Sequence, residues 1–216
     1  MSLLPAIKIC GLSTPDTLDA AIAAGADMVG FVFFPPSPRH LALDSARRLG
    51  AQAAGRARKV ALTVDASDET HIAIIAALAP DYLQLHGSES PARVKELRAK
   101  FGLPLIKAIG VSAAVDLASI DAYTAAADIV LLDAKPPKDA TRPGGNARSF
   151  DWTILRGVDI DTRWMLSGGL NPGNVAEALR ITRAPAVDVS SGVESAPGVK
   201  DAALIADFCA RVRAAV

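Results

Sequence analysis

Short apolar runs alternate with polar turns and helix-like stretches along this chain. The runs are rich in Val, Ile, Leu and Phe and too short for helices, which is typical of strands buried on both faces. Some of the stretches between them start with a hydroxyl side chain followed by proline, the signature of a capped helix start, as in 13–16 (Ser-Thr-Pro-Asp) and 88–91 (Ser-Glu-Ser-Pro). The pattern predicts strands over 7–10, 28–33, 59–64, 82–85, 105–108, 129–132, 164–166 and 187–189.

Strands that alternate with helices predict a parallel sheet. Eight such units, without a break in composition or a long linker, favour an α/β protein with a single (β/α)8 TIM barrel over an open doubly wound sheet. We therefore expect residues 1–216 to form one barrel domain. Its active site is expected at the carboxyl ends of the strands.

The last two predicted strands each run into a glycine-rich turn and then a helix. The turns are 167–174 (Ser-Gly-Gly-Leu-Asn-Pro-Gly-Asn) and 190–194 (Ser-Ser-Gly-Val-Glu). Glycine lets bare backbone approach a ligand, and a helix N-terminus offers unpaired N–H groups to an anion. One such turn is more often a simple helix cap. Two neighbouring turns after strands seven and eight of a barrel predict a phosphate site.

Four side chains at or just after the predicted strand ends are candidates for chemistry in the mouth of the barrel. Cys10 is either a small buried apolar residue or a partly ionised thiol that serves as base or nucleophile. Asp133 either caps a turn or, partly desolvated, donates a proton. Arg39 follows a stiff proline-rich loop and is either solvated or a bidentate partner for a carboxylate. His86 orients substrate or is a structural histidine.

Composition and short motifs indicate which classes of partner the protein binds and in which cellular compartment it lies. Half of the residues are apolar, and 23 basic residues balance 23 acidic ones, so no positive field draws in nucleic acid or an anionic membrane. The longest apolar run, 72–80, is too short to span a bilayer, and residues 1–5 carry no signal-peptide pattern, which favours a cytoplasmic protein. Neither a metal-ligand spacing nor a dinucleotide motif is present, so no metal or redox cofactor is implied. The long irregular stretch 134–149 is expected to be functional, as a loop that folds over the mouth.

Taken together, these motifs resemble the phosphoribosylanthranilate isomerase family of tryptophan biosynthesis. The resemblance spans nearly the whole chain and is carried by 8–12 (Lys-Ile-Cys-Gly-Leu), 25–39, 84–87 (Gln-Leu-His-Gly), 131–133, 144–145, 150–152, 167–170 and 187–194. It implies a cofactor-free barrel enzyme that converts N-(5-phosphoribosyl)anthranilate into 1-(2-carboxyphenylamino)-1-deoxyribulose 5-phosphate by an Amadori rearrangement. The expected partner is this small phosphorylated substrate, and the expected assembly is a monomer or a homodimer.

The resemblance also implies roles for individual residues. Asp133 would be the general acid, Cys10 the general base, and Arg39 the group that binds the anthranilate carboxylate, with Asp188 a partner for a sugar hydroxyl. The backbone of the two turns would hold the phosphate, at Gly168, Gly169, Ser190, Ser191 and Gly192.

One departure and two rival functions remain. Asn146 and Ala147 stand where the family usually has a small residue and another glycine, which puts the flexibility of that loop in question. The histidine-pathway isomerase performs the same rearrangement on a similar barrel, but is expected to carry an aspartate in place of Cys10. A noncatalytic phosphosugar-binding barrel would need neither the acid nor the base.

Overall fold

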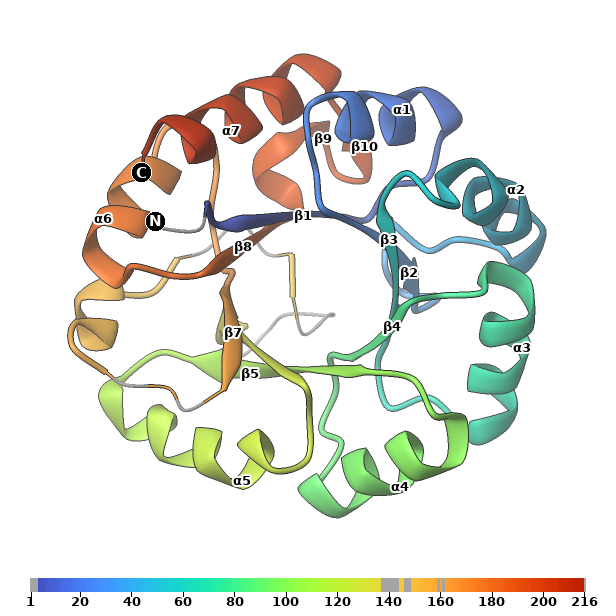
Figure 1. Cartoon of the computed structure of the whole chain (residues 1–216), viewed down its shortest axis with the longest axis horizontal. Coiled ribbons are helices and arrows are strands. Elements are labelled where there is room, and N and C mark those ends of the chain that lie inside the picture. Colours follow the sequence, from blue (N-terminus) through green and yellow to red (C-terminus); the bar gives the residue numbers. More distant parts are fainter. Residues whose placement is uncertain (1–3, 137–143, 146–148, 159, 161, 216) are drawn as a thin grey trace.

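Eight parallel strands close into a barrel in sequence order, so that β1 pairs with both β2 and β8, and helices surround them (Figure 1). This computed structural model describes residues 4–136, 144–145, 149–158, 160 and 162–215. The closed parallel barrel confirms the predicted fold class. The assignment of 1–216 to one domain stays a prediction. Among the described residues, no helix is long and apolar enough to cross a membrane.

The barrel strands are β1 (Ala6–Cys10), β2 (Met28–Phe33), β3 (Arg58–Thr63), β4 (Tyr82–Leu85), β5 (Leu105–Val111), β6 (Ile129–Ala134), β7 (Arg163–Leu166) and β8 (Ala186–Val189). The helices of the outer layer are α1 (Pro15–Ala23), α2 (Leu43–Ala53), α3 (Asp68–Leu78), α4 (Pro91–Phe101), α5 (Ile120–Thr124), α6 (Val175–Thr182) and α7 (Ala202–Ala214). Short 3-10 helices add η1 (Ala114–Ser119), η2 (Trp152–Leu155) and η3 (Ser191–Val193), and a hairpin is formed by β9 (Glu194–Ala196) and β10 (Val199–Lys200).

The predicted strands match the observed ones closely, and two differences bear on the site. Strand β6 continues past Leu132, so Asp133 lies inside the barrel wall, where it pairs in register with Gly110 of β5. The turn after β8 enters the short η3 and the β9–β10 hairpin before α7 begins, instead of running directly into a long helix. The predicted helix starts are confirmed, because the hydroxyls of Thr14 and Ser90 cap α1 and α4.

A repeated aspartate fixes the register at the amino ends of the strands. The residue before each of β2, β4 and β6 is an aspartate whose side chain accepts a backbone N–H from the start of the preceding strand. These bonds are Ile7 to Asp27 (2.8 Å), Lys59 to Asp81 (2.7 Å) and Leu105 to Asp128 (2.8 Å). Pro185 stands at the corresponding position before β8, and its carbonyl accepts the Ala6 N–H at 3.0 Å. Because these contacts lie at the end opposite the expected active site, we read them as contributions to stability.

Apolar side chains fill the space between strands and helices, whereas the barrel interior is partly polar. Side chains alternate in direction along a strand, so Ile7 and Ile9 of β1 join the large outer core while Lys8 and Cys10 point inward. Lys8, Gln84 and Asp188 are all buried at 4% exposure or less. Polar groups withdrawn from water in this way need partners, and those partners lie in one site.

Candidate active site

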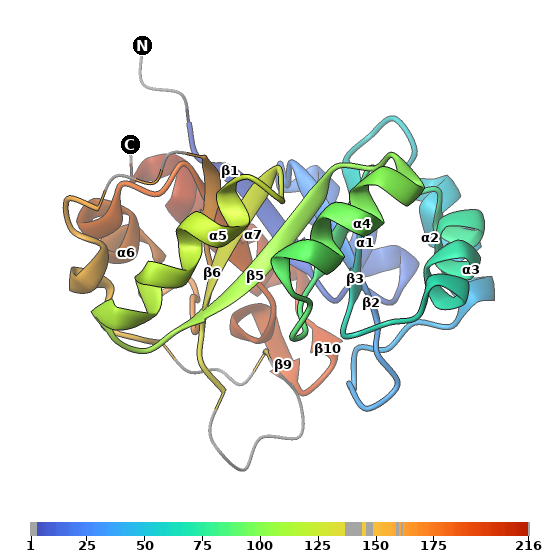
Figure 2. The same ribbon diagram turned by 90° about the horizontal axis from the view of Figure 1, so that it is seen from below.

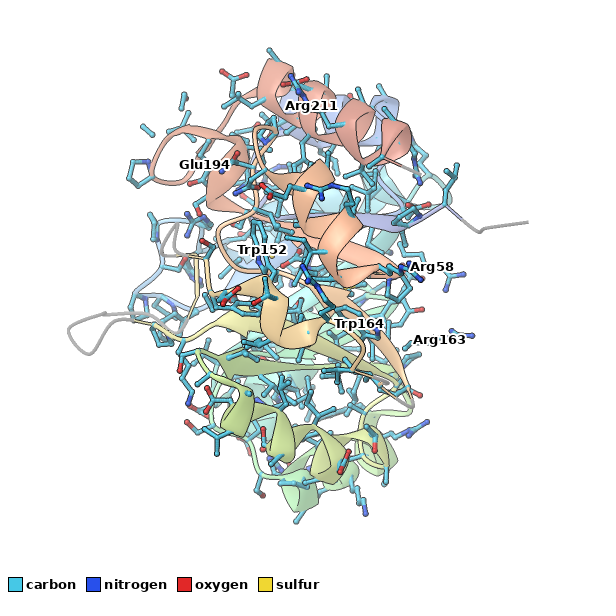
Figure 3. The ribbon with its side chains drawn as sticks, turned by 90° about the vertical axis from the view of Figure 1, so that its left-hand side faces the viewer. Arg58, Trp152, Arg163, Trp164, Glu194 and Arg211 are labelled. Carbon is cyan, nitrogen blue, oxygen red and sulfur yellow. The ribbon has the colours of Figure 1, made fainter. Side chains whose placement is uncertain are left out.

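One pocket opens at the carboxyl ends of the barrel strands and contains nearly every predicted site residue. Cys10, Arg39, His86, Asp133 and Asp188 line it, together with residues 167–170 and 189–191 of the two glycine-rich turns. The β9–β10 hairpin lies at this end of the molecule, and the start of β1 and the end of α7 lie at the other (Figure 2). Glu194 of the hairpin is accordingly at the opposite end from Arg58 and Arg163, which begin β3 and β7 (Figure 3).

Asp133 is held by a neighbouring amide and a histidine. Its Oδ1 accepts the Ala134 N–H at 2.8 Å, and its Oδ2 lies 3.2 Å from Nε2 of His86. The other ring nitrogen of His86, Nδ1, lies 2.9 Å from the amide nitrogen of Gln84. Protein groups therefore engage both ring nitrogens of His86, an arrangement that favours a role in orienting Asp133 over direct contact with substrate.

Two glycines pack against this pair because a side chain would not fit. A Cβ on Gly144 would lie 2.5 Å from Nε2 of His86, and a Cβ on Gly168 would lie 2.6 Å from the Ala134 nitrogen. Gly168 also has a φ of +86°, a conformation that favours glycine. Most of the long stretch 134–149 falls outside the described residues, Asn146 and Ala147 included, and its expected closure stays a prediction.

Cys10 lies beside a buried ion pair inside the barrel. Nζ of Lys8 lies 2.7 Å from Oδ1 of Asp188, and the Ser167 hydroxyl donates to Asp188 Oδ2 at 3.2 Å. Burial raises the pKa of the Cys10 thiol, and the Lys8 ammonium opposes that rise. Burial alone would lower the pKa of Lys8, but Asp188 and Cys10 raise it. The site thus holds a charged lysine and disfavours the partly ionised thiol that the sequence suggested.

Arg39 is buried in an ion-pair network, not solvated. Its Nε donates to Oε1 of Glu194 at 2.7 Å and its Nη2 to Oε2 at 2.8 Å. Lys200 also pairs with Glu194, at 2.5 Å. Burial opposes ionisation of Glu194, yet Arg39 and Lys200 lower its pKa to about 2. One edge of the guanidinium is thus already occupied, so the bidentate contact expected for a substrate carboxylate has to use the remaining edge.

The two glycine-rich turns pack directly on each other. A Cβ on Gly192 would lie 1.8 Å from the carbonyl oxygen of Leu170, so this glycine permits turn-to-turn contact, and it does not line the pocket. Lys200 reaches the second turn, donating to the Ser190 carbonyl at 2.9 Å and its hydroxyl at 3.3 Å. The ammonium group of Lys200 therefore contacts the predicted phosphate site, which the sequence indicated to be made of backbone groups alone.

The site also contains Lys8, Gln84, Glu194 and Lys200, to which the sequence alone assigned no role. Lys8 and Gln84 carried a usable signal, because a polar residue inside a short apolar strand must point to a polar interior. Glu194 stands in the predicted turn 190–194, but nothing local indicated its pairing with Arg39, and Lys200 carried no signal because it lies on a hairpin that the pattern did not predict. Among the described residues, no group of three or more His, Cys, Asp or Glu could hold a metal ion.

Comparison with known proteins gives one consistent result. The family model described as N-(5'phosphoribosyl)anthranilate (PRA) isomerase matches residues 7–211. Two proteins named N-(5'-phosphoribosyl)anthranilate isomerase are each 63% identical to this chain. The one from Nitrobacter winogradskyi aligns over 100% of this chain and 95% of its own length. The one from Rhodopseudomonas palustris (strain HaA2) aligns over 96% of this chain and 95% of its own length.

Solved structures agree with the sequence relatives. A phosphoribosyl anthranilate isomerase from Thermotoga maritima superposes with a TM-score of 0.87 at 33% identity, covering 98% of this chain and all of that one. Another such isomerase, in complex with reduced 1-(o-carboxyphenylamino)-1-deoxyribulose 5-phosphate, gives a TM-score of 0.85 at 32% identity over the same shares of the two chains.

Proposed function

Because this chain belongs to the N-(5'-phosphoribosyl)anthranilate isomerase family, we propose that it catalyses that isomerisation in tryptophan biosynthesis, with Asp133 as general acid and Cys10 as general base. The observation that carries the assignment is the shared pocket. A carboxyl group from β6 and a thiol from β1 line one cavity together with Arg39 and the two glycine-rich turns. Groups of different chemistry are thereby available for two successive proton transfers.

In the first step Asp133 gives its proton to the furanose ring oxygen. The bond from C1′ to that oxygen breaks, and the anthranilate nitrogen supplies its lone pair to form an iminium ion. In the second step the Cys10 thiolate, formed by loss of the thiol proton to water, removes the proton from C2′. The electrons of that C–H bond neutralise the iminium and give an enolamine, which tautomerises to the ketone product.

The charges around Cys10 support its role as a base once substrate is bound. Burial raises the pKa of the thiol, so a neighbouring positive charge is needed for ionisation. Lys8 supplies one, and Asp188 holds Lys8 in place at 2.7 Å. The iminium formed in the first step would supply a second. We assign the sugar hydroxyl to Oδ2 of Asp188. Among the described groups, this oxygen accepts only the Ser167 hydroxyl, at 3.2 Å, whereas Lys8 is 2.7 Å from Oδ1.

The two ends of the substrate are assigned to different groups that line the pocket. We assign the phosphate to the backbone of the two turns, at Gly168, Gly169, Ser190 and Ser191, with Gly192 shaping the contact between the turns. The carboxylate would meet the edge of Arg39 that Glu194 leaves available. Holding both ends fixes the reacting carbons between the acid and the base.

The test is turnover of phosphoribosylanthranilate by the purified protein, measured as the decrease in fluorescence of this substrate. We expect Cys10→Ala and Asp133→Asn each to lower kcat about 10²- to 10⁴-fold while the circular dichroism spectrum is unchanged. Near-normal turnover in either variant would end that residue's assignment. Turnover of the histidine-pathway substrate alone would favour the rival isomerase, and phosphate binding without turnover would favour a noncatalytic barrel.

The assembly is a separate question. A Thermotoga maritima relative is described as a dimeric isomerase from which monomers were generated, with a TM-score of 0.83 to this chain. We propose a monomer or a homodimer for this protein, and light scattering on the purified chain distinguishes the two.

A further inference from the structure

Gln84 is fully buried inside the barrel and places its amide beside the proposed acid site. It lies on β4, two residues before His86, and its amide nitrogen is 2.9 Å from Nδ1 of His86. The amide oxygen of Gln84 is buried and has no hydrogen-bond partner among the residues that the structure describes. A buried acceptor without a partner is unfavourable and calls for an explanation.

The hydrogen bond from Gln84 decides which nitrogen of His86 carries the proton. An amide NH2 group can only donate, so Nδ1 of a neutral His86 must accept and its proton must be on Nε2. Nε2 is the nitrogen that faces Oδ2 of Asp133, at 3.2 Å. His86 is therefore a donor toward Asp133.

This tautomer matters because Oδ2 of Asp133 both faces His86 and has to carry the proton that is given to the substrate. Oδ1 accepts the Ala134 N–H at 2.8 Å, which leaves Oδ2 to carry the acid proton. If Nε2 of His86 were unprotonated, it would accept that proton in a hydrogen bond and hold it away from the substrate. With a proton on Nε2, His86 donates to Oδ2 instead, and the acid proton is left to point into the pocket.

We propose that Gln84 is a positioning residue for the proton transfer: it fixes His86 as the Nε2–H tautomer, so that Asp133 presents its proton to the substrate. After the proton has left, the same Nε2–H stabilises the carboxylate that remains. The amide oxygen stays without a partner among the described residues because the amide nitrogen faces His86. If the amide were turned over, its oxygen would accept a hydrogen bond from Nδ1–H, and His86 would be the opposite tautomer. The inference rests on the proposed role of Asp133 as the acid.

The test is the Gln84→Met variant, which keeps a side chain of similar length and removes the donor. The chain has three histidines, so the nitrogen signals of His86 can be assigned in a ¹⁵N-histidine NMR spectrum by comparison with His86→Asn. We expect the wild-type protein to show an unprotonated Nδ1 and a protonated Nε2. We expect Gln84→Met to show a mixture of both tautomers, with kcat about 10- to 100-fold lower and KM within about twofold, as for loss of a group that orients a histidine.

The matched control is Gln52→Met, because Gln52 is a half-buried glutamine of α2 outside the pocket, whose side chain bonds the Pro15 carbonyl and Asp19. It should leave both the NMR signals and kcat unchanged. An unchanged His86 tautomer in a folded Gln84→Met, or an unchanged kcat, would overturn the proposal. Loss of the acid assignment would instead appear as normal turnover in Asp133→Asn, and the tautomer measurement does not depend on that result.

Discussion

Arg39 and Glu194 are 155 residues apart in the chain and form a two-point ion pair in the wall of the pocket, at 2.7 and 2.8 Å. Both side chains are only 4% exposed. The pair ties the proline-rich loop after β2 to the β9–β10 hairpin, and Lys200 extends it to Ser190 of the second glycine-rich turn. The groups assigned to the two ends of the substrate thus share one charged network.

Replacing Glu194 by Gln should therefore damage both binding and stability. The change leaves two buried cations with a neutral partner, and breaking a buried ion pair costs about 3–5 kcal/mol. We expect KM for phosphoribosylanthranilate to rise about tenfold or more, as Arg39 loses its fixed orientation. Steady-state kinetics and urea unfolding measure the two effects. The matched control is Glu177→Gln, whose exposed pair with Arg180 spans 3.6 Å. If Glu194→Gln behaved like this control, the network would have no role.

Acid should remove the contribution of Glu194 to stability. Its pKa is lowered from 4.5 to about 2 in the folded protein, so the stabilisation is present above pH 4.5 and is lost as the pH falls through about 2. A shift of that size corresponds to about 3 kcal/mol. The free energy of unfolding of the wild-type protein minus that of Glu194→Gln should shrink over this range. A difference that stays constant with pH would contradict the assigned ion pairing.

The thiol of Cys10 should react slowly at neutral pH. Burial raises its pKa above the ordinary 9.0, so little thiolate is present at neutral pH. In a Cys209→Ser background, we expect alkylation by iodoacetamide to keep accelerating as the pH rises above 9.0. Lys8→Met should slow the reaction further, because the ammonium favours the thiolate. A rate already at its plateau near neutral pH would show that the thiol is ionised without substrate.

Adding a methyl group to either turn should separate folding from phosphate binding. Gly192→Ala puts a Cβ 1.8 Å from the Leu170 carbonyl oxygen, so it should destabilise the fold by about 1–3 kcal/mol or more. Gly169→Ala should weaken binding of inorganic phosphate and substrate together. Its control is Gly102→Ala, because Gly102 has nearly the same φ, +65° against +66°, and open space around its Cβ. Calorimetric titration with phosphate measures the difference. Equal phosphate affinity in Gly169→Ala and Gly102→Ala would place the phosphate elsewhere.

The sequence by itself determined the barrel and which strand ends carry chemistry. Strands with the predicted bounds appear over Met28–Phe33 and Tyr82–Leu85, and Thr14 and Ser90 cap helices as predicted. These features are local, because apolar runs, hydroxyl caps and prolines act within a few residues. In a parallel barrel the carboxyl ends of all strands meet at one face, so Cys10 and Asp133 could be placed in one mouth without coordinates.

Only the tertiary structure decided how those residues are paired and charged. Closure of the barrel sets Lys8 of β1 in register with Asp188 of β8, although 180 residues separate them. The β9–β10 hairpin brings Glu194 to Arg39, and β4 brings Gln84 to His86. Periodicity reports that a position is buried, but it does not report which distant group becomes its partner. Because burial makes each of these polar groups depend on its partner, the ionisation of Cys10, the pairing of Arg39 with Glu194 and the tautomer of His86 follow from the closed barrel and not from any local pattern.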